Sequence, residues 1–326
     1  MMERYNADPR RYDEGTMTFN RCGSSGVLLP KVSLGFWHNF GGVDPYERSR
    51  EITHYAFDHG VVHFDLANNY GPPYGSAEET MGRLMVDDFH TYRDELFISS
   101  KAGYDMWPGP YGNWGSRKYL MASLDQSLRR MHLDYVDLFY SHRYDPETPL
   151  EETLQALVDI VRQGKALYVG ISRWPLEATR TAFNYLKAHD VPLLIYQGRL
   201  NMLDREPQQE GILDFCADNG VGFISFSPLA QGLLTDRYLH CESTTDGRVT
   251  GIPEDSRMSK GKFLKESMLT PELLEQLKAF NTEAQSHGHT LAEHALRWIL
   301  EQRGVTSVLV GASSVRQLER NLQCVR

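Results

Sequence analysis

Short apolar runs alternate along the chain with longer segments in which apolar residues recur at helical spacing. The runs of strand length span residues 32–36, 61–66, 96–100, 135–140, 166–171, 193–196, 222–227 and 307–310. The amphipathic segments span residues 46–59, 77–87, 118–132, 150–162, 176–189, 208–219, 271–287 and 291–303, and another helix begins at Val315. Eight strand-then-helix units in succession predict an α/β fold, the (β/α)8 TIM barrel.

Glycine and proline mark the ends of these elements. Gly60, Gly164 and Gly220 follow predicted helices, at positions where a left-handed residue often ends a helix. Pro175 stands where a helix is predicted to begin, because its fixed φ suits the first turn. Residues 17–29 place Gly-Ser-Ser-Gly between two short β-prone pieces, which predicts an N-terminal β-hairpin capping the bottom of the barrel.

An open, doubly wound sheet is the alternative to a barrel. That fold favours a glycine-rich turn after its first strand, and residues 35–38, Gly-Phe-Trp-His, do not supply one. The chain shows no linker, internal repeat or low-complexity tract, so we expect a single domain over residues 1–326. Its longest irregular stretch, residues 241–262, follows the seventh predicted strand, where barrels often bind phosphate.

Composition and charge narrow the range of partners. The 326 residues carry a net charge of -9, so there is no basic excess to neutralise nucleic-acid phosphates. Residues 1–15 are polar, and no apolar stretch approaches the ~20 residues of a membrane helix. We therefore expect a soluble, cytoplasmic protein. The four cysteines lie far apart without a C-x-x-C pair, which predicts reduced thiols at Cys22, Cys216, Cys241 and Cys324.

Four polar residues follow three of the apolar runs: Asp65, Tyr70, Lys101 and His142. In a barrel of parallel strands these positions share one rim, where catalysis takes place. An ammonium at Lys101 would lower the pKa of the Tyr70 phenol from its ordinary value near ~10, and Asp65 would hold that ammonium in place. We therefore predict that Tyr70 protonates a substrate carbonyl while His142 orients it.

Each of these residues has an ordinary interpretation when it is taken alone. Asp65 could end a strand, Tyr70 could pack in a turn, Lys101 could be solvated and His142 could be a core histidine. Because all four lie on one rim of the predicted barrel, a catalytic site is favoured over four separate ordinary interpretations. A strand-end lysine in a barrel can also form a Schiff base, so a class I aldolase with Lys101 as nucleophile stays an alternative.

Other residues carry weaker signals. Trp37 follows the first predicted strand, and we expect it to line the substrate pocket rather than only to pack against the rim. His287, His289 and His294 lie at the junction of two predicted helices. A closed metal site needs a fourth ligand in the right geometry, so we interpret them as helix-end histidines and expect no metal.

The sequence resembles the aldo-keto reductase family. The resemblance rests on segments 64–71, 100–101, 141–143, 169–174, 226–234 and 311–313, so it covers nearly the whole chain. Within the family, the sequence is most similar to the branch that holds glyceraldehyde-phosphate reductases and the β subunits of voltage-gated potassium channels. Segments 70–78, 101–112 and 229–234 point to the glyceraldehyde-phosphate reductases. A channel subunit has Asn where this chain has His142. The resemblance therefore favours a working reductase over a non-catalytic, NADPH-binding, redox-sensing subunit.

The resemblance implies an NADPH-dependent carbonyl reductase. NADPH would lie extended across the barrel mouth without a Rossmann turn, and its hydride would pass to the carbonyl carbon. The implied substrates are small aldehydes and ketones, foremost L-glyceraldehyde 3-phosphate and methylglyoxal. Asp65, Tyr70, Lys101 and His142 become the catalytic set, and Trp37, Tyr70 and His142 the substrate contacts. The resemblance also points to a homo-oligomer, a tetramer or an octamer.

The resemblance also assigns residues to the reacting half of the cofactor. Ser172, Arg173 and Gln197 would hold the nicotinamide end, and Phe226 would stack near its ring. Residues 227–231 would cover the pyrophosphate.

The far half of the cofactor would contact basic and polar residues near the end of the chain. Arg237 and Arg257 occupy positions that face phosphates in the family, and two guanidiniums near a 2′-phosphate would select NADP over NAD. Ser313 and Gln317 would contact the adenosine end. The complete implied set of cofactor contacts is Trp37, Asp65, Ser172, Arg173, Gln197, Phe226, Ser227, Pro228, Leu229, Ala230, Gln231, Arg237, Arg257, Gly311, Ser313, Gln317 and Asn321.

Two departures from the family pattern change these expectations. Family members often carry Glu directly before Asn321, where it contacts adenine, and this chain has Arg320. One adenine hydrogen bond is then lost, so we expect a lower cofactor affinity. Relatives also continue beyond the last helix with a segment that contributes to the substrate pocket, whereas this sequence ends at Arg326.

Overall fold

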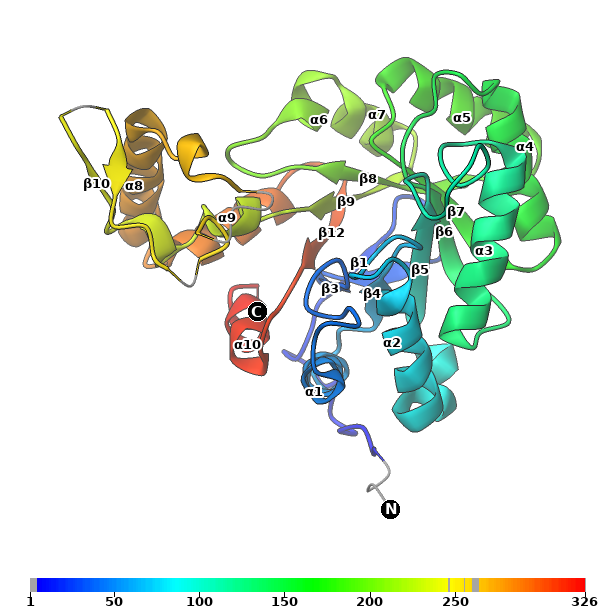
Figure 1. Cartoon of the computed structure of the whole chain (residues 1–326), viewed down its shortest axis with the longest axis horizontal. Coiled ribbons are helices and arrows are strands. Elements are labelled where there is room, and N and C mark those ends of the chain that lie inside the picture. The colour runs from blue at the N-terminus through cyan, green and yellow to red at the C-terminus, as the bar shows by residue number, and fades with distance from the viewer. Residues whose placement is uncertain (1–4, 246, 255, 260–263, 326) are drawn as a thin grey trace.

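A computed structural model describes residues 5–245, 247–254, 256–259 and 264–325. Its centre is a closed barrel of eight parallel strands, which confirms the TIM-barrel prediction (Figure 1). In spatial order the strands are β12 (Val305–Val310), β3 (Val32–Gly35), β4 (His63–Asp65), β5 (Phe97–Ala102), β6 (Val136–Ser141), β7 (Ala166–Ser172), β8 (Leu193–Arg199) and β9 (Gly222–Phe226).

Helices follow the strands and cover the outside of the barrel (Figure 1). Each buries one apolar stripe against the strands, as α4 does with Leu154, Leu157 and Val158, while Glu151 and Glu152 in its first turn stay exposed. The strands are buried on both faces, which explains their continuous apolar runs. The helices are α1 (Tyr46–Asp58), α2 (Ser76–Leu84), α3 (Arg117–Met131), α4 (Leu150–Arg162), α5 (Leu176–Ala188), α6 (Glu206–Gln209), α7 (Ile212–Asp218), α9 (Leu291–Leu300) and α10 (Val315–Gln323).

An N-terminal hairpin closes the bottom of the barrel, as the sequence predicts. Its strands β1 (Phe19–Arg21) and β2 (Leu28–Pro30) pair antiparallel. The backbone N–H of Ser24 donates to the carbonyl of Gly220 at 2.9 Å, just before β9 begins. Apolar side chains of the hairpin pack in one cluster with residues of the barrel interior, namely Cys22, Val27 and Leu29 with Leu138, Tyr140, Ile195, Ile224 and Leu309. The hairpin therefore plugs the lower end of the barrel.

The segment after β9 forms a separate small layer. Its buried residues pack in a hydrophobic cluster of their own that includes Tyr238, Leu274, Leu277 and Leu291. Figure 1 shows α8 and β10 to the left of the barrel strands. Residues 246, 255 and 260–262 of the irregular stretch lie outside the described residues. The elements here are η3 (Ala230–Gly232), η4 (Asp236–Tyr238), β10 (Glu242–Ser243), β11 (Val249–Thr250), η5 (Glu266–Met268) and α8 (Pro271–Ser286).

Two predicted helices differ from the observed ones. The segment 208–219 is not one helix, because Gly211 adopts a φ of 74° and separates α6 from α7. The segment 77–87 stops as an α-helix at Leu84 and continues as a π turn, η1 (Met85–Phe89), and a 3₁₀ turn, η2 (His90–Glu95). Helical periodicity of apolar residues does not distinguish these tighter or wider turns from an α-helix.

The predicted helix ends are confirmed. Gly60, Gly164 and Gly220 adopt positive φ values of 78°, 71° and 68°. Pro175 is the N-cap residue directly before α5, which begins at Leu176. No helix within the described ranges is long and apolar enough to cross a membrane.

The contact between hairpin and barrel floor depends on Gly23. A Cβ at this position would lie 2.0 Å from the carbonyl oxygen of Gly220, and the φ of 54° is also unfavourable for a side chain. We expect Gly23→Ala to lower the free energy of unfolding by about 2 kcal/mol or more. Gly26→Ala, in open space within the same hairpin, should change it by less than about 0.5 kcal/mol. Urea denaturation measures both, and equal changes would contradict the role of this contact.

Candidate active site

The barrel brings the four predicted catalytic residues to its upper rim. Asp65 is the last residue of β4, Lys101 lies near the end of β5, and His142 directly follows β6. Tyr70 lies in the loop after β4. The strand register pairs Asp65 with Ser99 and Lys101 with Tyr140, and because alternate residues share a face, the carboxylate and the ammonium both point into the interior. None of the four is more than 9% exposed, so they meet in a nearly water-free space.

Lys101 lies at the centre of this group and uses all three of its N–H donors. Its Nζ lies 2.5 Å from Asp65 Oδ2, 2.6 Å from the carbonyl oxygen of Leu66 and 3.3 Å from the Tyr70 hydroxyl. An ammonium has no lone pair, so the Tyr70 oxygen is the acceptor in the last contact. The hydroxyl proton of Tyr70 is therefore left to point elsewhere, toward a ligand in the barrel mouth.

The predicted lowering of the Tyr70 pKa is wrong. Burial raises the pKa of Tyr70 well above its usual value, and the charge of Asp65 adds to the rise. The physical reason is that Lys101 is already paired with Asp65, so the pair offers the phenolate little net attraction while burial removes its water. Burial also lowers the pKa of Lys101, against the opposing effect of Asp65. Tyr70 is thus a protonated donor at neutral pH.

His142 is neutral in this setting. Burial lowers the pKa of His142 well below its usual value, and the positive charges of Lys101 and Arg173 add to the effect. Its ring meets that of Tyr70 edge-on, with 5.9 Å between centroids. Its Nδ1 is buried and has no hydrogen-bond partner among the described residues. A neutral imidazole with an unused nitrogen beside a phenol proton suits the binding of a carbonyl oxygen.

Tyr104, which sequence reasoning did not single out, belongs to this group. Its ring lies edge-on to that of His142, with 4.8 Å between centroids, and its hydroxyl is 3.2 Å from Arg173 Nη1. It comes from the loop after β5, three residues beyond Lys101. The aromatic composition of that loop is the signal that could have identified it.

The residues expected at the nicotinamide end lie beside the catalytic group. Ser172 and Gln197 are paired in the register of β7 and β8. Gln197 Nε2 donates to Asp65 Oδ1 at 3.2 Å, so the amide touches the ion pair directly. Arg173 follows Ser172 with a left-handed φ of 57°. Phe226 ends β9 and is only half buried, as a stacking surface must be.

The segment expected to cover the pyrophosphate has an unusual backbone. Ser227, Ala230 and Gln231 adopt positive φ values of 51°, 46° and 58°, which residues other than glycine rarely adopt. Asn201 Nδ2 holds this segment by donating to the carbonyl oxygen of Ser227 at 3.1 Å. Pro228 and Leu229 complete the turn. Strain of this kind typically persists where a ligand is bound, so the segment fits a cofactor cradle.

The residues expected at the far end of the cofactor are more dispersed. Gln317 Oε1 accepts from the backbone N–H and the hydroxyl of Ser313, at 2.9 and 3.0 Å, at the start of α10. Gly311 lies directly after β12, and Asn321 is buried in α10. The three arginines considered at this end are all exposed: Arg237 in η4, Arg257 in the turn that follows β11, and Arg320 in α10.

Trp37, expected in the substrate pocket, is half buried after β3, where its ring lies 4.1 Å from that of His38. The rings of His287 and His294 stack at 5.9 Å. Across the residues that the structure describes, no group of three or more His, Cys, Asp or Glu side chains could hold a metal ion.

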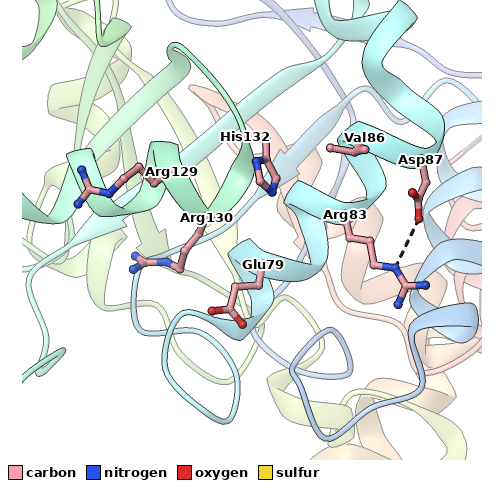
Figure 2. A pocket seen from close by; sticks show the side chains of 7 residues that line it. All are labelled: Glu79, Arg83, Val86, Asp87, Arg129, Arg130 and His132. Carbon is pink, nitrogen blue, oxygen red and sulfur yellow. Dashed lines mark ion pairs between the residues drawn. The ribbon is translucent and has the colours of Figure 1, made fainter.

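A surface pocket of about 420 Å³ lies away from the rim, on the outer faces of α2, η1 and α3 (Figure 2). Arg83 and Asp87 form an ion pair across its edge at 3.4 Å. No residue of the catalytic group lines this pocket, so it is separate from the candidate active site at the barrel mouth. The lining residues are Glu79, Arg83, Val86, Asp87, Arg129, Arg130 and His132.

Comparison with known proteins agrees with this geometry. Residues 31–326 match the model of the aldo/keto reductase family. The chain is 55% identical over 323 residues to the L-glyceraldehyde 3-phosphate reductase of Escherichia coli O157:H7, covering 98% of this chain and 90% of that protein. It is 32% identical over 314 residues to a probable voltage-gated potassium channel subunit beta of Arabidopsis thaliana, covering 95% and 91%.

A solved structure is also similar over most of its length. The thermostable aldo-keto reductase Tm1743, in complex with the inhibitor epalrestat, superposes with a TM-score of 0.71 at 29% sequence identity. The match covers 94% of each chain.

The buried ion pair makes Asp65 important for stability as well as chemistry. In Asp65→Asn the Lys101 ammonium loses its counter-charge, and we expect the free energy of unfolding to fall by about 3–5 kcal/mol. The double variant Asp65→Asn/Lys101→Met should regain part of the lost free energy of unfolding, because it leaves no charge buried alone. Chemical denaturation of both variants tests this. A single variant as stable as the wild type would show that the pair is not required for folding.

Proposed function

Because the chain belongs to the aldo-keto reductase family, whose members are oxidoreductases that use NAD(P)H, we propose that it reduces small aldehydes and ketones to alcohols with NADPH. L-glyceraldehyde 3-phosphate is the first substrate to test, since it is the one named for the relative at 55% identity. Methylglyoxal, another small aldehyde, is the second. The observation that carries the proposal is the free proton of Tyr70, whose oxygen accepts from Lys101.

In this mechanism Tyr70 is the general acid. It donates its proton to the substrate carbonyl oxygen, and Lys101 stabilises the phenolate that forms. Asp65 holds Lys101 in place at 2.5 Å. The N–H of neutral His142 donates a hydrogen bond to the same carbonyl oxygen and so orients the substrate. When bound, the reduced nicotinamide supplies hydride to the carbonyl carbon.

The choice of NADPH rests on two basic side chains. Arg237 in η4 and Arg257 in the turn after β11 are both exposed and belong to the layer that follows β9. Guanidiniums there would bind a 2′-phosphate with charge-assisted hydrogen bonds, which NAD lacks. Ser172, Gln197 and Phe226 would hold the nicotinamide. The Arg320 position offers adenine no carboxylate, so we expect affinity to come from the phosphates.

The aldolase alternative is disfavoured by the state of Lys101. A Schiff-base lysine must offer a neutral amine to the substrate carbonyl. Lys101 Nζ is instead fully buried, and its three donors go to Asp65, Leu66 and Tyr70. The non-catalytic subunit alternative has the support of the relative at 32% identity. Turnover of any aldehyde by the wild-type protein would exclude it.

Replacement of Tyr70 tests the acid role directly. Tyr70→Phe removes the proton and keeps the ring, so we expect aldehyde-dependent NADPH oxidation to fall by about 10²–10⁴-fold. NADPH affinity, measured by fluorescence titration, should stay unchanged. Tyr168→Phe provides the control, because Tyr168 packs against Phe97 in the lower barrel. A Tyr70→Phe rate above about a tenth of the wild-type value would contradict the role.

The neutral state of His142 predicts the pH dependence of reduction. Since its pKa is lowered, His142 takes up a proton only below the ordinary imidazole range, and Tyr70 with its raised pKa stays protonated on the alkaline side. We therefore expect kcat to be flat between about pH 6 and 8. A pH–rate profile of the wild type and of His142→Asn tests this. An acid limb near the ordinary imidazole pKa that disappears in His142→Asn would refute it.

A further inference from the structure

A chain of buried side chains crosses the barrel interior below the candidate active site. Ser307 Oγ lies 2.7 Å from Ser33 Oγ, and Ser33 Oγ lies 2.8 Å from His63 Nδ1. His63 Nε2 lies 3.0 Å from Ser99 Oγ, which donates to Asp65 Oδ1 at 2.7 Å. All five residues are at most 2% exposed. A continuous path of hydrogen bonds therefore ends on the carboxylate that holds Lys101.

The barrel explains why these side chains meet. Strands β12, β3, β4 and β5, which carry them, are consecutive neighbours. His63 precedes Asp65 by two residues on β4, so both side chains face the interior. The other side of the interior is filled by apolar residues of β6, β8 and β9, namely Leu138, Ile195 and Ile224. Buried polar groups need hydrogen-bond partners, and these ones find them in one another.

The charge of Asp65 fixes the donor-to-acceptor direction of every hydrogen bond in this path. A carboxylate paired with an ammonium only accepts hydrogen bonds, so the Ser99 hydroxyl must donate to it. The Ser99 oxygen then accepts from His63, which requires the tautomer protonated on Nε2. His63 Nδ1 is left as an acceptor for Ser33, and Ser33 in turn accepts from Ser307. Every donor in the chain points toward Asp65, and aligned donors of this kind strengthen one another.

We propose that His63 is a positioning residue for the reduction, acting through Ser99 on Asp65 and so on Lys101 and Tyr70. The inference rests on the proposed function, because it concerns the proton that Tyr70 donates. The short bond from Ser99 holds Asp65 Oδ1, which leaves Oδ2 directed at Lys101. A carboxylate that loses this directed donor can rotate. Lys101 would then lose the position in which it supports Tyr70.

The titratable groups around Asp65 allow this arrangement at neutral pH. Lys101 approaches from β5, Tyr70 from the loop after β4 and Tyr140 from β6. Burial raises the pKa values of both phenols well above the usual range, so they are uncharged. Burial lowers the pKa of His63 to about 4, so its ring is neutral as well. Among these groups the Asp65–Lys101 pair carries the charge, and the buried Glu78, paired with Arg130, also acts on Lys101. The direction of the hydrogen bonds therefore holds across the physiological range.

The test compares four variants of the full-length protein. His63→Leu fills the space and removes both ring nitrogens, whereas His63→Gln keeps an N–H donor for Ser99. Ser99→Ala removes the donor to Asp65 itself. Ser225→Ala is the matched control, since Ser225 is a buried strand serine that donates to the carbonyl oxygen of Leu200 outside the chain. Single-turnover oxidation of bound NADPH by L-glyceraldehyde 3-phosphate reports the chemical step without product release.

We expect Ser99→Ala and His63→Leu to slow the single turnover by about tenfold. The acid limb of their pH–rate profiles should move to higher pH, because a carboxylate with fewer hydrogen-bond donors takes up a proton more readily. His63→Gln and Ser225→Ala should stay within about threefold of the wild type. Folded His63→Leu with the wild-type rate and pH profile would overturn the proposal. If His63→Leu does not fold, a Ser99→Ala variant as fast as His63→Gln would overturn it equally.

The same measurements separate this proposal from the proposed function. If the wild-type protein oxidises NADPH with neither L-glyceraldehyde 3-phosphate nor methylglyoxal, both proposals are refuted. A wild type that turns over and loses its rate in Tyr70→Phe, with all His63 and Ser99 variants unaffected, refutes the positioning role alone.

Discussion

A lysine ammonium and an aspartate carboxylate lie 2.5 Å apart in the upper barrel, both almost fully closed off from water. Burial of two charges costs several kcal/mol per ion unless every remaining donor and acceptor is satisfied. Here the surroundings meet that condition, because Lys101 has three acceptors and Asp65 receives donors from Ser99 and Gln197. The rest of the site is arranged around this pair.

The pair also explains why Tyr70 is a donor and not a phenolate. Its pKa is raised by burial, so the phenol keeps its proton in the resting protein. In the proposed reduction, the nearby ammonium acts mainly on the charge that develops as the proton leaves. This is the arrangement expected of electrostatic catalysis, in which a fixed charge stabilises the transition state more than the ground state.

The barrel interior is divided between two chemistries. Strands β12 to β5 contribute serine and histidine side chains that hydrogen-bond to one another, while β6 to β9 contribute mainly apolar side chains that pack on the N-terminal hairpin. The apolar half seals the lower end. The polar half connects the buried ion pair to the strand interior, so the scaffold and the site share hydrogen bonds. Under the proposed positioning role, we expect changes well below the rim to reach the Tyr70 proton.

Sequence pattern alone determined the (β/α)8 fold, the hairpin plug and the position of Asp65, Tyr70, Lys101 and His142 on one rim, because strand periodicity and strand-to-helix order are local properties. It also identified the glycine helix ends. Only the tertiary structure decided the ionisation of the site and the partners of each side chain. The pKa of Tyr70 depends on how completely Lys101 is already neutralised by Asp65, and the chain through His63 depends on four strands that are distant in sequence and adjacent in space. Burial and long-range contacts set those quantities, and neither is visible in a linear pattern.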